Sequence, residues 1–183
     1  TIRTPEITDA SATVVVRTAV QNQGSGAASA NTIVETTILD RAGRAVGKGQ
    51  ARAIVGEGAT TDVTATMTIT RPHRWSIDDP YLYSASTRVL VNGAPVDIVS
   101  TTFGVRTIAF TQEEGFLLNG VRVPLRGVCL HHDLGALGAA AYDRAIERQL
   151  QIMKSMGVNA IRTSHNPPAP SLLDAADRLG FVV

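Results

Sequence analysis

The sequence is poor in cysteine and in aromatic residues. It contains one cysteine, Cys129, among 183 residues, so no disulfide can form within the chain. Aromatic side chains make up only 4% of the residues, with one tryptophan and three tyrosines. Aromatic faces are the usual stacking surface for a bound ring, so this shortage argues against a free-standing carbohydrate-binding module.

Charge of one sign and long apolar runs are also missing. Seventeen basic residues balance 16 acidic ones, the net charge is +1, and no basic cluster occurs. This balance excludes nucleic acid or an anionic membrane as the main partner. No apolar run reaches membrane-spanning length and no signal peptide is visible, so we expect a soluble protein. The compartment stays open between cytoplasmic and periplasmic or secreted, because the sequence starts at Thr1 rather than Met and a leader could lie upstream.

The first hundred residues carry short strands with a period of two. Apolar residues alternate with threonine from 64 to 70, and a similar alternation runs from Ala12 to Val20 and over Ile33–Leu39. Asn92-Gly93 separates Thr87–Val91 from Val96–Val99 and predicts a two-residue hairpin, since both residues tolerate positive φ. Several short strands of this kind predict a β-sandwich.

The pattern changes after Phe110. A small hairpin around Asn119-Gly120 precedes an apolar strand over Leu125–Leu130. A helix follows, with apolar residues at helical spacing from Ile146 to Met156 and Gly157 at its end. A second strand over Val158–Thr163, a helix from Pro170 to Gly180 and a third strand from Phe181 complete a parallel α/β unit. This order fits either a doubly wound sheet or a (β/α)₈ barrel.

Polar side chains follow the first two of these parallel strands. The first strand ends in His131, His132 and Asp133, and the second in Arg162, Ser164, His165 and Asn166. Neighbouring parallel strands bring both groups to one rim, where imidazoles can bind hydroxyl groups and a guanidinium can orient a carboxylate. We expect His132 to point away from this rim, because adjacent strand residues face opposite sides. The histidine spacing matches no recognised zinc pattern, so no metal is predicted.

Three segments resemble glycoside hydrolase family 2, whose members include β-galactosidases and β-glucuronidases. The C-terminal stretch N-A-I-R-T-S-H-N-P-P-A-P-S-L-L-D-A-A-D-R-L-G-F-V-V, residues 159–183, is similar to the family signature, except that Asn166 stands where many members carry Tyr. Phe116–Gly135 resembles the segment that opens the catalytic barrel in this family. Trp75–Tyr83, W-S-I-D-D-P-Y-L-Y, resembles a segment of the preceding immunoglobulin-like domain.

The resemblance implies a multidomain fold and a site. It predicts an immunoglobulin-like β-sandwich over residues 1–107, followed over 108–183 by the first three of the eight strands of a TIM barrel. It places His131, His165 and Asn166 in the subsite that binds the sugar, and Arg162 beside the nucleophile's carboxylate. It implies no cofactor. We therefore expect the chain to be a central piece of a larger enzyme, and its incomplete barrel to favour self-association.

The implied activity is retaining hydrolysis of terminal β-glycosidic bonds in a β-linked saccharide. A β-galactoside is favoured because the His-Asn-Pro and Cys-Leu-His-His-Asp variants look most like β-galactosidases, while β-glucuronide and β-mannoside stay open. Such hydrolysis uses two carboxyl groups roughly 5–5.5 Å apart. The acidic pairs Asp78-Asp79 and Glu113-Glu114, and the helix residue Glu147, do not form one. We therefore expect both catalytic glutamates to lie beyond Val183 and this chain alone to be inactive. The rival interpretation is a non-catalytic sandwich module for carbohydrate binding or domain contact.

Overall fold

The computed structural model describes residues 1–24 and 29–183 and separates them into two compact units. The first unit combines Thr1–His73 with Leu82–Val105. The second combines Arg74–Tyr81 with Arg106–Val183. The short segment Arg74–Tyr81, called the 74–81 segment below, therefore belongs with residues that come later in the chain.

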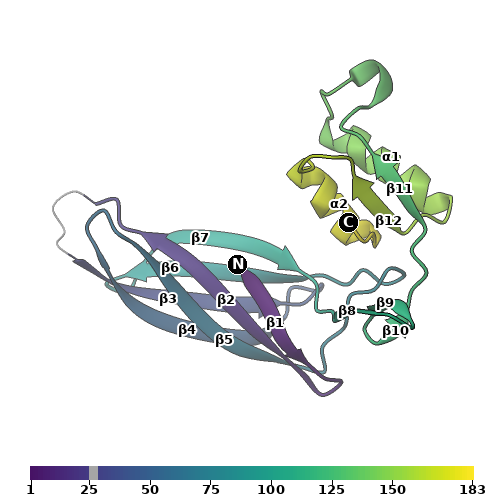
Figure 1. The fold of residues 1–183 in the computed structure, drawn as a ribbon. Coiled ribbons are helices and arrows are strands. Elements are labelled where there is room, and N and C mark those ends of the chain that lie inside the picture. Colours follow the sequence, from purple (N-terminus) through teal and green to yellow (C-terminus); the bar gives the residue numbers. More distant parts are fainter. Residues whose placement is uncertain (25–28) are drawn as a thin grey trace. The chain divides into compact units, whose positions relative to one another are not determined.

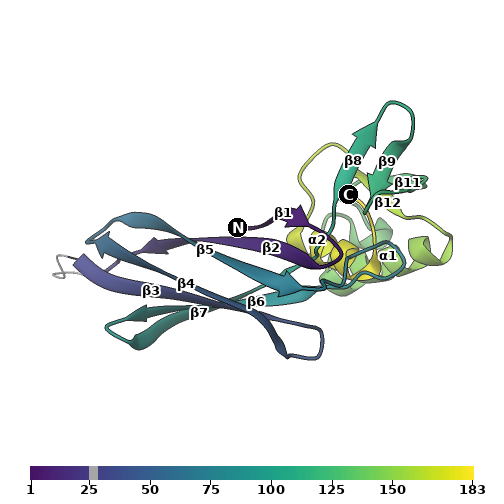
Figure 2. The same ribbon diagram turned by 90° about the horizontal axis from the view of Figure 1, so that it is seen from below.

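The first unit is an antiparallel β-sandwich, as predicted (Figure 1). Figure 2 shows its two layers, with β2 and β5 in one and β3, β6 and β7 in the other. One sheet has the order β1-β2-β5 and the other β4-β3-β6-β7. The strands are β1 (Ile2–Ile7), β2 (Ser11–Gln21), β3 (Ser29–Leu39), β4 (Ala45–Gly56), β5 (Thr60–Thr70), β6 (Tyr83–Val91) and β7 (Ala94–Phe103).

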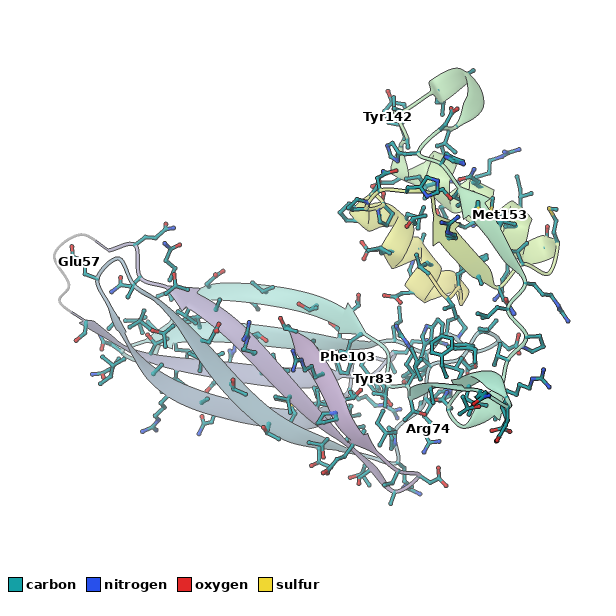
Figure 3. All side chains as sticks on the ribbon, viewed as in Figure 1. Glu57, Arg74, Tyr83, Phe103, Tyr142 and Met153 are labelled. Atoms are coloured by element: carbon teal, nitrogen blue, oxygen red, sulfur yellow. The ribbon has the colours of Figure 1, made fainter. Side chains whose placement is uncertain are left out.

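The core of the sandwich follows the period-two pattern of its sequence. Val14 on β2 and Ile69 on β5 are almost fully buried, and their sequence neighbours Thr13 and Thr70 are not. One side chain in two therefore faces the opposite sheet, which is the arrangement that makes the alternation stable. Near one end of the unit, Tyr83 and Phe103 stack with ring centroids 5.8 Å apart (Figure 3).

Two details of the sandwich concern glycine. The Asn92-Gly93 hairpin is confirmed: it joins β6 to β7 with φ values of 51° and 82°, as a type I′ turn requires. The strand β4 was not among the predicted ones, because its glycines look like turn residues. Gly49 lies inside β4, where a Cβ would stand 3.0 Å from the Met67 side chain. Glycine there permits the close approach of β4 to β5.

The second unit begins with a small antiparallel sheet of order β10-β9-β8 and continues as strand, helix, strand, helix, strand. The Asn119-Gly120 turn predicted between β9 and β10 is present, with φ values of 54° and 78°. β11 and β12 pair in parallel, and Val182 adds a parallel bridge to Ala160. The elements are β8 (Ile108–Thr111), β9 (Gly115–Leu118), β10 (Val121–Arg122), β11 (Gly127–Leu130), the 3₁₀ turn η1 (Gly135–Leu137), α1 (Asp143–Ser155), β12 (Ala160–Thr163) and α2 (Pro170–Leu179).

The helices α1 and α2 cover one face of the β11–β12 sheet and form its core. Ile146 and Leu150 of α1 pack with Leu130 and Ile161 of the strands. Met156 lies beyond the end of α1 and is 74% exposed. The sequence predicts one apolar face of α2 from Leu172, Leu173, Ala176 and Leu179. In the structure Leu173 is exposed, and the smaller Ala175 is buried in its place. No helix in the described residues is long and apolar enough to cross a membrane.

The 74–81 segment is held to the rest of the second unit by hydrogen bonds and a buried tryptophan. The Trp75 indole is 1% exposed, and its Nε1–H donates to the Asp177 backbone oxygen at 2.8 Å. The Arg106 guanidinium lies 4.7 Å from the Trp75 ring centroid, which is cation–π distance. Lys154 Nζ on α1 donates to the Ile77 carbonyl at 2.8 Å. These contacts connect the segment to both helices of the unit.

Candidate functional site

The register of the two parallel strands decides which side chains share the free face of their sheet. Cys129 on β11 is paired with Arg162 on β12, and Val128 with Ile161. Val128 and Ile161 pack against the helices. Because successive strand residues face opposite sides, Cys129 and Arg162 point away from the helices. Both residues are exposed.

The ends of the strands bring two of the predicted site histidines together. The rings of His131 and His165 meet edge to face, with centroids 6.3 Å apart. Both histidines are exposed. An imidazole ring has two nitrogens that can take part in hydrogen bonds, which suits neighbouring sugar hydroxyls. The proximity of the two rings is a structural finding, whereas their role in sugar binding stays a prediction.

The other polar residues of the rim have more local contacts. His132 Nε2 lies 3.0 Å from the Ala139 carbonyl oxygen in the loop after η1, so its ring is engaged apart from the His131–His165 pair. The Asn166 amide donates to the Pro167 carbonyl at 3.2 Å, a contact within its own turn. Asn166 shares with His131 and His132 the lining of a cavity of about 30 Å³ at the strand ends. That volume holds roughly one water molecule.

Arg162 has no ion-pair partner among the residues that the structure describes. Its guanidinium Nη1 lies 4.0 Å from Cys129 Sγ. An arginine on the free face of this sheet can bind a carboxylate through two parallel hydrogen bonds. Such a carboxylate would have to come from another part of the barrel.

Asn159, the first residue of the signature, is structural. Its Oδ1 accepts a hydrogen bond from the Arg126 backbone at 2.7 Å, and its Nδ2 donates to the Pro124 carbonyl at 3.0 Å. Its own carbonyl accepts from the Val182 N–H at 2.9 Å. Asn159 thus connects the starts of the three parallel segments. The signature marks Asn159, but its hydrogen-bond partners are distant in the sequence and become visible only in the structure.

Within residues 1–24 and 29–183, no group of three or more metal-ligating side chains occurs. Of the acidic residues considered in the sequence, Glu147 forms ion pairs on the surface of the helices. Glu147 pairs with Arg144 at 3.6 Å and with Arg178 at 3.8 Å. The Asp79 backbone N–H donates to the Ser76 hydroxyl at 3.0 Å, within a turn. Among the described residues, the rim therefore carries imidazole, amide and guanidinium groups and no pair of opposed carboxylates.

The comparison with known families and structures covers both units. Residues 1–106 match the model of glycosyl hydrolases family 2, and residues 108–183 match the model of its TIM barrel domain. The chain belongs to glycosyl hydrolases family 2. Its fold is the family's sandwich domain followed by the start of the TIM barrel domain.

The relatives in this family include proteins named β-galactosidase and proteins named β-glucuronidase. The β-galactosidase BoGH2A of Bacteroides ovatus is 46% identical over 153 residues, which is 84% of this chain and 18% of that protein. A β-glucuronidase of Bacteroides fragilis is 35% identical over 127 residues, 69% of this chain and 18% of that protein. A crystal structure of a family 2 member from Bacteroides cellulosilyticus has a TM-score of 0.91 at 38% identity, covering 98% of this chain and 24% of that one. The chain thus spans less than a quarter of these relatives' lengths.

Proposed function

We propose that this chain supplies the sandwich domain and the first part of the barrel of a retaining β-glycosidase. The observation that carries the proposal is the convergence of His131, His165 and Arg162 at one end of the parallel sheet, in a family of glycosidases. Barrel enzymes build their sites at the carboxyl ends of the strands. The sandwich covers 1–107 and the barrel portion 108–183 in this proposal.

In the proposed mechanism, the chain binds and orients while groups from the rest of the barrel do the covalent chemistry. His131, His165 and Asn166 bind sugar hydroxyls. Arg162 holds the nucleophilic carboxylate in position for attack on the anomeric carbon, and a second carboxylic acid protonates the leaving oxygen. Water then hydrolyses the covalent glycosyl–enzyme intermediate, and the configuration of the sugar is retained.

A β-galactoside is the proposed substrate, supported by the β-galactosidase named among the relatives at 46% identity. The β-glucuronidases named among the relatives keep a β-glucuronide as the second candidate. No observation favours a carbohydrate-binding module, since the sole tryptophan is buried and offers no stacking surface.

The test compares alanine variants in the complete enzyme with an aryl β-galactoside and an aryl β-glucuronide as substrates. His131→Ala and His165→Ala should each lower kcat/KM about 10- to 100-fold, the loss of one good hydrogen bond in the transition state. Arg162→Ala should reduce kcat most, because a misplaced nucleophile impairs chemistry more than binding. His132→Ala is the matched control, since its ring contacts the Ala139 carbonyl, and should cost clearly less.

Wild-type kcat/KM in both His131→Ala and His165→Ala would show that the two histidines are structural. Thermal melts of each variant separate loss of function from loss of folding. The isolated chain should release no aryl leaving group above a buffer blank, because it lacks the opposed carboxylates. Turnover that persists through repurification and scales with the amount of chain would overturn the proposal.

A further inference from the structure

We draw no further inference here: the strongest candidate, the cleft of about 550 Å³ between the two sheets of the sandwich, lined mostly by valine and threonine side chains, carries none because nothing in the structure shows what covers it.

Discussion

The sandwich and the start of the barrel differ in how the faces of their β-sheets are covered. The antiparallel sheets of the sandwich cover each other with one face apiece and leave the other face to solvent. The parallel sheet of β11 and β12 is covered by helices on one face, and its other face carries the exposed Cys129 and Arg162. Parallel sheets are normally buried on both faces. Polar residues are therefore ordinary on the outer faces of the sandwich, whereas the polar side chains on the second face of the barrel sheet belong to the proposed site.

The two units also differ in how far along the chain their contacts reach. The sandwich is held largely by strands that pair in register. The second unit depends in addition on the 74–81 segment, whose hydrogen bond from Trp75 to Asp177 joins residues 102 positions apart. The start of the barrel is therefore stabilised partly by the 74–81 segment, which lies between two strands of the sandwich in the sequence. Four predictions test this contrast.

The largest effect is expected from Trp75→Ala. Removing an indole that is 1% exposed should destabilise the second unit by about 3–5 kcal/mol. Trp75→Phe keeps an aromatic ring but loses the donor to Asp177, and should cost about 1–2 kcal/mol. Hydrogen exchange followed by mass spectrometry reports the two units separately. Equal loss of protection in sandwich and barrel peptides would contradict the prediction that Trp75 stabilises only the second unit.

The second effect comes from the close approach of the 74–81 segment to the end of α2. Gly180 has φ of 77°, and a Cβ there would collide with the Ile77 carbonyl oxygen. Gly180→Ala should therefore destabilise the second unit by about 2–3 kcal/mol, seen in urea unfolding followed by Trp75 fluorescence. Gly157→Ala is the matched control: φ is 85° with no atom near the added Cβ, so strain alone should cost about 1 kcal/mol. Equal effects of both changes would argue against the close approach.

A third, smaller effect tests the polar pair in the sandwich core. The buried hydroxyls of Thr36 and Thr87 share a hydrogen bond of 3.0 Å. Thr36→Val leaves the Thr87 hydroxyl without its partner and should cost about 1–2 kcal/mol. The double variant with Thr87→Val should come back close to the wild type, because neither hydroxyl then lacks a partner. Additive losses in urea unfolding would mean that the pair does not act as a unit.

The smallest effect is the pH dependence of the sandwich. The Arg44 backbone N–H, with further hydrogen bonds from the Arg44 side chain and from Ala42, lowers the pKa of the Asp40 carboxyl below its ordinary value, against the opposing effect of burial. A carboxyl with a lowered folded pKa adds stability above its unfolded pKa, and that stability is lost as pH falls through the folded pKa. The melting temperature of the sandwich should fall less steeply with acid in Asp40→Asn. Arg44→Ala keeps the backbone donor and should retain much of the dependence; a profile identical to Asp40→Asn would assign the effect to the side chain.

Much of the fold was predictable because its signals are local. The hairpins at Asn92-Gly93 and Asn119-Gly120 and the helix α1 were read from neighbouring residues, and all are confirmed. The strand β4 was missed because Gly47 and Gly49 look like turn residues until the neighbouring strand is known. The exposed side of α2 at Leu173 was missed because small Ala175 fills the contact with the sheet.

For the candidate site, strand order was enough to predict that His131 and His165 would share a rim, since parallel neighbours end at the same edge. The pairing of Cys129 with Arg162 was not predicted, although strand alternation with the correct register would have found it. Register is a property of two strands, and neither strand specifies it alone.

The sequence by itself determined most of the element types, the family and the polar residues at the strand ends, because periodicity, turn chemistry and signature residues are contained in short segments. Only the tertiary structure decided that the 74–81 segment belongs with the barrel start, that His132 is held by Ala139, and that Cys129 lies beside Arg162. The physical reason is distance along the chain. These contacts join residues whose proximity depends on the packing of helices against strands and on strand register, and neither can be read from one segment in isolation.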